Sequence, residues 1–181
     1  RARPAFEPFV ACLAAANPKP SRPMAGSQNT LLFKRTHFAT RLPLDCRYSP
    51  SHFWAREMDG VLRIGFTKFA TRMLGDMVDH GFEVKPDSPV APGQILGWVE
   101  GFKAISDVYA FAEGEFHGTN PALQKDIALI NRKPYEDGWL YEVAGTLDDK
   151  CVDAEGYAAI LNSTIDKMLE QQQAEKGKDI E

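Results

Sequence analysis

The sequence has few of the features that mark specialised protein classes. Its 181 residues include only three cysteines, at positions 12, 46 and 151, and no CxxC pair. This set is too small and too scattered for a disulfide framework or a CxxC zinc site. The longest apolar run, residues 9–16, is far too short to cross a bilayer. The sequence therefore argues against a membrane protein and against a disulfide-stapled miniprotein.

The chain also has no excess of positive charge. It carries 21 Lys and Arg against 25 Asp and Glu, a formal charge of −4, so no overall field favours nucleic acid. A length of 181 residues is typical of one domain with room for a hydrophobic core. We expect a single-domain monomer that binds neither nucleic acid nor membranes.

Common catalytic motifs are missing as well. There is no GxSxG, no P-loop and no GxGxxG. The four histidines, at positions 37, 52, 80 and 117, do not stand three to five residues apart on an evident helix, so no metal site is indicated. A Cys–His pair would have to meet in space, and chance alone offers many such pairs.

Charge is unevenly distributed along the chain. Residues 1–42 carry seven basic side chains and one acidic side chain, whereas residues 43–181 carry 14 basic and 24 acidic ones. We expect residues 1–42 to be a basic, disordered N-terminal extension of a cytoplasmic protein. An Arg-bearing, acid-poor leader is also typical of transit peptides, which would place the protein in the mitochondrial matrix. Met24 is an alternative start.

After residue 42 the pattern predicts short strands separated by turns. The Asp59-Gly60 dipeptide before the apolar stretch 61–65 predicts a hairpin. Thr67 can cap a short helix that Gly75 would end. Two further strand-like runs, residues 95–100 and 105–111, lie on either side of a four-residue turn.

Helix signals follow these strands. Asn120-Pro121 is a typical helix start, because Asn caps and Pro suits the first helical position. Asp153 can cap a C-terminal helix with a stripe of apolar residues at helical spacing: Tyr157, Ile160, Leu161, Ile165, Met168 and Leu169. We expect a β-rich α+β domain over residues 43–170 and a polar, frayed tail over residues 171–181.

Lys103 is the candidate functional residue. The turn between the runs 95–100 and 105–111 would place its ammonium at the end of a hairpin. Gly101 gives the turn backbone freedom, and Ala104 leaves the lysine uncrowded. An exposed ε-amine can be acylated, and its stem then becomes the base of an arm that reaches several sites at high effective concentration.

Residues 99–109 (VEGFKAISDVY) resemble the lipoyl-lysine hairpin of the glycine cleavage system H protein family. Other segments resemble the family in the same order along the chain. These are residues 52–54 (HFW), 64–70 (IGFTKFA), 74–76 (LGD), 114–116 (GEF), 120–123 (NPAL) and 131–139 (NRKPYEDGW). The resemblance covers the chain from about Tyr48 to the final helix.

The resemblance implies a barrel-sandwich hybrid of two small antiparallel sheets with short helices and a C-terminal helix. It implies a carrier rather than an enzyme, with lipoate in amide linkage to Lys103 and with Glu100 recognised by the lipoate-attaching enzyme. Biotin carriers flank their lysine with Met, where this chain has Phe102 and Ala104. Lipoyl domains of 2-oxoacid dehydrogenases place Asp directly before the lysine, and Phe102 departs from that pattern.

The sequence is compatible with two pathways. The partners are either the glycine cleavage enzymes or, if the chain is a divergent H-like paralogue, a heterodisulfide-reductase-like sulfur oxidation system. Gly101-Phe102 in place of the family's Ser-Val is one of several departures that favour the paralogue. A third possibility is a binding module in which Lys103 is never lipoylated and has no function. Cys46 and Cys151 are interpreted as buried or incidental thiols, although either could approach the dithiolane.

Overall fold

The computed structural model describes residues 29–178. Its strands are β1 (Thr30–Arg35), β2 (Phe38–Pro43), β3 (Arg47–Tyr48), β4 (Phe53–Met58), β5 (Val61–Phe66), β6 (Met77–Phe82), β7 (Ser88–Val90), β8 (Ile95–Gly101), β9 (Ile105–Tyr109), β10 (Ala112–Thr119) and β11 (Tyr141–Leu147). Its helices are α1 (Lys68–Leu74), the 3-10 helix η1 (Pro121–Gln124), α2 (Leu129–Arg132) and α3 (Ala154–Lys178).

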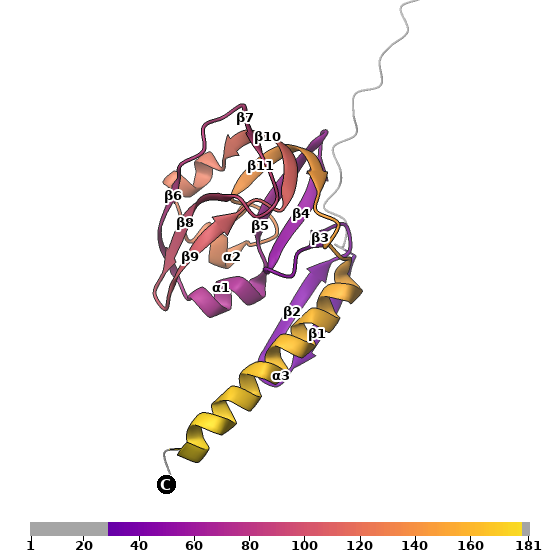
Figure 1. Cartoon of the computed structure of the whole chain (residues 1–181), viewed down its shortest axis with the longest axis vertical. Helices are drawn as coiled ribbons and strands as arrows, with labels where there is room; N and C mark the ends of the chain where they lie inside the picture. Colours follow the sequence, from indigo (N-terminus) through magenta and orange to yellow (C-terminus); the bar gives the residue numbers. More distant parts are fainter. Residues whose placement is uncertain (1–28, 179–181) are drawn as a thin grey trace, which may run out of the picture.

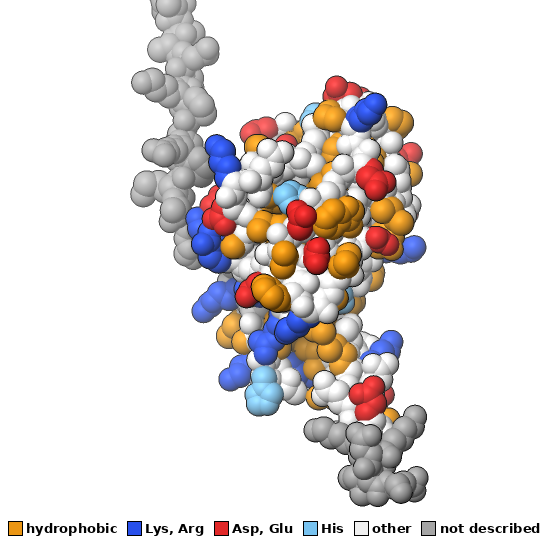
Figure 2. Space-filling model, turned by 90° about the vertical axis from the view of Figure 1, so that its left-hand side faces the viewer, with side chains coloured by type: hydrophobic (Ala, Val, Ile, Leu, Met, Phe, Trp, Pro, Cys, Tyr) orange, Lys and Arg blue, Asp and Glu red, His pale blue; other side chains and the backbone are white. Residues whose placement is uncertain are grey.

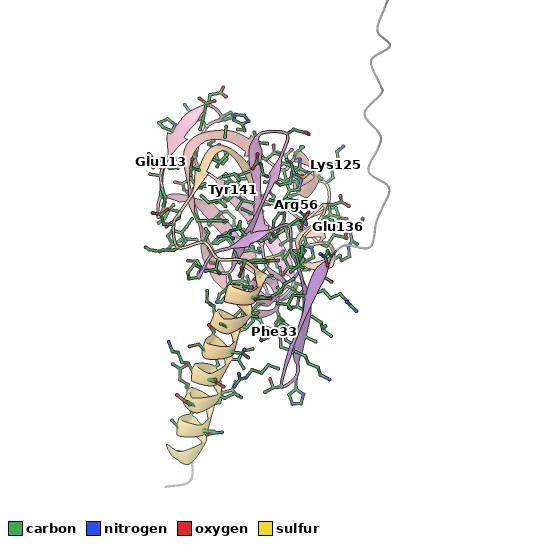
Figure 3. The ribbon with its side chains drawn as sticks, turned by 90° about the vertical axis from the view of Figure 1, so that its right-hand side faces the viewer. Phe33, Arg56, Glu113, Lys125, Glu136 and Tyr141 are labelled. Atoms are coloured by element: carbon green, nitrogen blue, oxygen red, sulfur yellow. The ribbon has the colours of Figure 1, made fainter. Side chains whose placement is uncertain are left out.

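Two antiparallel sheets form the body of the molecule, as expected (Figure 1). One has six strands in the order β3-β4-β5-β11-β10-β7, and the other has three in the order β6-β8-β9. Side chains from both sheets fill the space between them, and Tyr141 lies in this interior (Figure 3). The fully buried members include Ile64, Val99, Val108 and Phe116. The barrel-sandwich fold with a C-terminal helix is therefore confirmed.

Local signals in the first half of the domain are confirmed. Asp59 and Gly60 both have positive φ, 52° and 84°, which gives the β4–β5 hairpin a two-residue turn. The Thr67 side chain accepts a hydrogen bond from the Ala70 amide at the start of α1. Gly75 ends that helix with a φ of 83°. These turns place the end of α1 directly before β6.

The two later helix starts are also confirmed. The Asn120 side chain caps η1 by accepting from the Ala122 amide at 3.0 Å, with Pro121 at the first position. Asp153 Oδ1 accepts from the Gly156 amide at 2.8 Å at the start of α3. The second strand of the lysine hairpin is shorter than expected and ends at Tyr109 instead of residue 111.

The expectation that the N-terminal extension is disordered as far as residue 42 is wrong for residues 30–42. These residues form the β1–β2 hairpin, which lies beside α3 (Figure 1). Phe33, Phe38 and Leu42 point inward, and together with Phe69 and the buried face of α3 they make a second hydrophobic cluster. Tertiary burial therefore orders a segment whose local pattern looked like a tail. Residues 1–28, which carry the rest of that prediction, lie outside the described residues.

The frayed tail expected over residues 171–181 is also corrected. Helix α3 continues through Gln171 to Lys178. Residues 171–175 are exposed, so no hydrophobic contact holds them. Gln, Ala, Glu and Lys are good helix formers, and they extend the helix that packing begins. No helix in the part of the chain that the structure describes is long and apolar enough to span a membrane.

Replacing Phe38 with Ala tests whether the β1–β2 hairpin is part of the folded unit. The Phe38 ring packs edge-on against Phe69, with ring centroids 5.4 Å apart, and only 6% of the residue is exposed. We expect Phe38→Ala to lower the free energy of unfolding by about 3 kcal/mol. Urea denaturation measures this change.

Leu32→Ala is the matched control, because Leu32 lies on the same hairpin but is 61% exposed. Its effect should stay within about 0.5 kcal/mol. Equal effects of the two substitutions would show that the hairpin does not contribute to the folded core.

Candidate functional site

The structure places Lys103 at the end of the β8–β9 hairpin, where the sequence predicted it. Glu100 and Ile105 are the last paired residues, and the Gly101 amide donates to the Ala104 carbonyl at 2.9 Å. Residues 101–104 are called the lysine turn below. Lys103 is exposed, and its Nζ lies 3.4 Å from the Arg72 carbonyl oxygen of α1. The side chain thus leans toward α1 from an open position.

The lysine turn is attached to the segment that joins α1 to β6. The Phe102 amide donates to the Asp76 carbonyl, and the Lys103 amide donates to the Leu74 carbonyl, both at 2.9 Å. An isolated hairpin turn would leave these amides to water. Here the two residues that carry the candidate site are held by backbone bonds from a different part of the chain.

Two glycines allow this close approach. At Gly101 a Cβ atom would overlap the Leu74 carbonyl oxygen, so this position requires the absence of a side chain. At Gly75 a Cβ would lie 3.1 Å from Lys103 Cγ, and its φ of 83° favours glycine as well. The role predicted for Gly101 was backbone freedom, whereas the structure shows that its main role is steric.

Asn131 fixes the same segment from the opposite side. Its Nδ2 donates to the Gly75 carbonyl, and its Oδ1 accepts from the Met77 amide, both at 2.9 Å. One amide side chain therefore bridges the residues before and after Asp76. The sequence did not predict this role, because the two partners of Asn131 lie 54 and 56 residues away along the chain. The only sequence signal was the position of Asn131 at the start of the family-like segment 131–139.

Glu100 lies three residues before Lys103 on β8 and is half-buried. Its neighbours across the strands are Asp79 on β6 and Ile105 on β9. Glu100 and Lys103 thus share one end of the small sheet.

A groove runs between α1 and β9 beside the lysine turn. Its volume is about 290 Å³, and Met73, Leu74 and Phe66 give it an apolar wall, with Ser106 and Asp107 on β9 opposite. At the far end of β9 it meets a second pocket of about 500 Å³, with which it shares Ser51, Phe53 and Tyr109.

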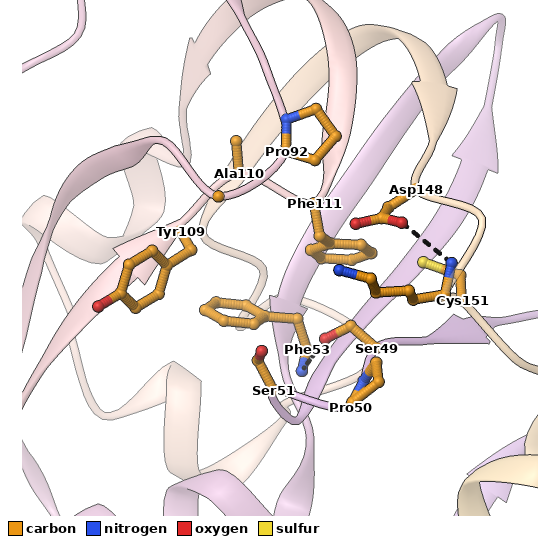
Figure 4. A pocket seen from close by; sticks show the side chains of 12 residues that line it. Ser49, Pro50, Ser51, Phe53, Pro92, Tyr109, Ala110, Phe111, Asp148 and Cys151 are labelled. Atoms are coloured by element: carbon orange, nitrogen blue, oxygen red, sulfur yellow. Dashed lines mark hydrogen bonds between the residues drawn. The ribbon is translucent and has the colours of Figure 1, made fainter.

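The second pocket combines aromatic and polar side chains (Figure 4). The rings of Phe53, Phe111 and Tyr109 line it, together with the hydroxyls of Ser49 and Ser51. Seen together, the groove and this pocket follow the length of β9 away from Lys103. An apolar chain attached to the lysine would find a continuous surface there.

The thiols of the two described cysteines are buried. Burial raises the pKa of the Cys46 thiol to about 12 and that of the Cys151 thiol to about 11. Both are buried, as expected, and both stay protonated at neutral pH, so they are weak nucleophiles. Within residues 29–178, no group of three or more His, Cys, Asp or Glu side chains is placed to hold a metal ion.

A buried polar chain anchors the start of α1. Tyr157 Oη lies 2.9 Å from His52 Nδ1 and 2.8 Å from Thr67 Oγ1, which also caps the helix. One consistent arrangement has Thr67 donating to Tyr157 and Tyr157 donating to a neutral His52. Burial supports this arrangement, because it lowers the pKa of His52 to about 4. The helix that supports the lysine turn is thereby tied to α3.

Comparisons with known proteins point to one family. The family model described as "Glycine cleavage H-protein" matches residues 46–170. A glycine cleavage system H protein of Corynebacterium jeikeium is 40% identical over 126 residues, which cover 66% of this chain and 97% of the relative. One from Pseudoalteromonas atlantica is 40% identical over 124 residues, which cover 65% and 94%.

A solved structure gives the same answer. The crystal structure of a glycine cleavage system H protein from Mycobacterium marinum superposes with a TM-score of 0.60 at 34% identity. The likeness covers 65% of this chain and 97% of that chain. The β1–β2 hairpin, which ends at Pro43, precedes the residues that the family model matches.

Gly101→Ala tests the steric requirement at the lysine turn. The added methyl group cannot coexist with the Leu74 carbonyl, so the turn must move away from α1. We expect a loss of about 2 kcal/mol of stability and faster hydrogen exchange at the Phe102 and Lys103 amides. Two-dimensional NMR of the exchanging amides measures the second effect.

Gly60→Ala is the control, because a Cβ there meets nothing within 4 Å although its φ is 84°. It should cost about 1 kcal/mol through backbone strain alone and leave exchange at the lysine turn unchanged. Protection of the Phe102 amide in the Gly101→Ala protein would contradict the proposed contact.

Acidification should weaken the fold through His52. Its pKa is near 6.5 in the unfolded chain and about 4 in the folded one, so the unfolded state binds more protons between these values. Stability is therefore complete above pH 6.5 and falls as the pH drops toward 4, by about 3 kcal/mol at most. Urea unfolding at several pH values measures the slope.

His52→Asn removes the titrating group and keeps a residue that tolerates the observed φ of 66°. The difference between the wild-type and variant profiles isolates His52 from all other groups. Parallel profiles over this range would show that His52 does not titrate as described.

Proposed function

Because the chain belongs to the glycine cleavage H-protein family, which supports a lipoyl-carrier role, we propose that Lys103 carries lipoate through an amide bond. The observation that supports this most directly is the position of Lys103, which is exposed at the end of a hairpin whose backbone is held rigidly. An attaching enzyme can reach the amine without unfolding any part of the domain. The protein would act as a carrier on which partner enzymes work, with no turnover of its own.

Attachment is an acyl transfer to the lysine side chain. The neutral Nζ attacks the carbonyl carbon of an activated lipoate such as lipoyl-adenylate, which the attaching enzyme makes from lipoate and ATP. The N–C amide bond forms, the C–O bond to the phosphate breaks, AMP leaves and the amine proton passes to solvent. The lysine loses its positive charge, so the hydrogen bond from its Nζ to the Arg72 carbonyl oxygen is no longer charge-assisted.

When bound, lipoate supplies a dithiolane that takes up electrons or a transferred group. The residues around Lys103 suit such a group. Arm and lysine together extend about 14 Å from the backbone, and the groove between α1 and β9 offers Met73, Leu74 and Phe66 to its apolar chain. We infer that this groove shelters the arm between visits to partner enzymes.

Glu100 is proposed as a recognition residue for the attaching enzyme. It lies near the end of β8, three residues before Lys103, and is only half-buried. A protein that docks over the turn therefore meets this carboxyl together with the amine.

The glycine cleavage enzymes are the proposed partners, with the protein moving an aminomethyl group and reducing equivalents between them. The relatives reported above are all named as glycine cleavage system H proteins. The alternative of a heterodisulfide-reductase-like sulfur oxidation system rests only on sequence departures such as Gly101-Phe102, and none of these relatives bears that name.

Lys103→Arg tests the carrier role. We expect the wild-type protein, coexpressed with a lipoate-attaching enzyme and fed lipoate, to gain one lipoyl group, and the variant to gain none. Intact mass with peptide mapping measures the modification. Thermal stability should not change, because Lys103 is exposed.

Lys125→Arg is the matched control, since Lys125 is another exposed lysine, at the end of η1 (Figure 3). It should be lipoylated at Lys103 like the wild type. An unmodified wild-type protein with several attaching enzymes, or a lipoyl group on a different lysine, would refute the assignment.

A further inference from the structure

The residues around Lys103 expose an unusual amount of apolar surface. Phe102 is 82% exposed and Ile105 is 68% exposed, the two highest values among the large hydrophobic residues of the described chain. Val78 on β6 and Met73 on α1 add partly exposed side chains at 49% and 41%. Phe102 and Ile105, on either side of Lys103 and Ala104, are called the apolar pair below.

The fold gives no reason for Phe102 to be aromatic. Its ring is absent from both hydrophobic clusters and from the aromatic contacts within the described residues. Its backbone, in contrast, is held by the bond from its amide to Asp76 and by the bond from the Lys103 amide to Leu74. A rigid backbone that displays a solvent-exposed ring is typical of an anchor residue, because little entropy remains to be lost on binding.

Acidic side chains surround the apolar pair. Asp76 directly precedes β6, Asp79 is on β6, Glu100 is on β8, and Asp107 is on β9. Figure 2, seen from the side where β6, β8 and β9 lie, shows acidic groups scattered among hydrophobic ones. A complementary surface would be an apolar pocket bordered by Lys or Arg side chains.

The length of the lysine side chain indicates which partner carries that pocket. Nζ extends only about 6 Å from its Cα, so an enzyme that acylates Nζ must touch the residues next to Lys103. An enzyme that acts on the finished arm works at its far end, about 14 Å from the backbone, and can dock elsewhere. The apolar pair thus lies inside the footprint of the first enzyme by necessity.

We propose that Phe102, supported by Ile105, is the anchor by which a lipoate-attaching enzyme recognises this protein, through an apolar pocket bordered by basic side chains. The proposal rests on the function assigned above and adds the chemistry of the partner surface. Phe102 is a specificity residue here and takes no part in the acyl transfer itself.

The test is the kinetics of lipoylation of Phe102→Ala. A purified lipoate–protein ligase, ATP and lipoic acid are mixed with the full chain, and intact mass follows the modified fraction over time at several protein concentrations. We expect KM for the protein to rise about tenfold and kcat to stay within a factor of two, because Lys103 remains in place. Phe102→Leu, which keeps an apolar side chain, should recover part of the loss.

Leu32→Ala is the matched control, as a large side chain that is 61% exposed and lies on the β1–β2 hairpin. It should leave KM unchanged. High salt should raise the wild-type KM, because the acidic surround contributes through charge. Unchanged melting temperatures verify that the exposed substitutions leave the fold intact.

Three outcomes would overturn the proposal. An unchanged KM for Phe102→Ala would show that the ring is not recognised. Normal lipoylation combined with slow reaction of the arm with a downstream oxidoreductase would assign the apolar pair to that enzyme. A shift in sedimentation between wild type and variant, without a change in KM, would assign it to a second copy of this chain. Failure of the carrier role is distinguishable, because the wild-type protein would then gain no lipoyl group.

Discussion

Two backbone hydrogen bonds determine the geometry of the candidate site, and much of the surrounding structure serves to make them. They run from the Phe102 and Lys103 amides to the segment between α1 and β6. The missing side chain at Gly101 lets that segment approach, and Asn131 holds it from the other side. The Lys103 side chain is thereby exposed while its backbone is held in place.

Helix α1 connects this site to the rest of the molecule. Ala70 and Leu74 belong to the core between the sheets, while Phe69 belongs to the cluster formed with the β1–β2 hairpin and α3. The buried chain from His52 through Tyr157 reaches the cap of the same helix. The hairpin and α3 therefore support the site from a distance, although neither lies beside the lysine turn.

Much of the fold could be predicted because its signals are local. The positive φ values at Asp59 and Gly60, the cap at Thr67 and the glycine that ends α1 are properties of a few neighbouring residues. The hairpin that presents Lys103 was predictable for the same reason. The expectations that failed concern the segments 30–42 and 171–178, where packing in one case and helix propensity in the other gave order to stretches interpreted as tails.

By itself, the sequence determined the class of fold, the family and the residue at the end of the hairpin, since these follow from turn residues, strand-like apolar runs and a series of family-like motifs in order. Tertiary structure alone decided which atoms hold that residue in place and what surrounds it. Asn131 meets Gly75 and Met77, and Lys103 meets Leu74, only after the sheets have closed. The exposure of Phe102 and the groove along β9 likewise result from long-range packing, which the order of residues in one sequence does not display.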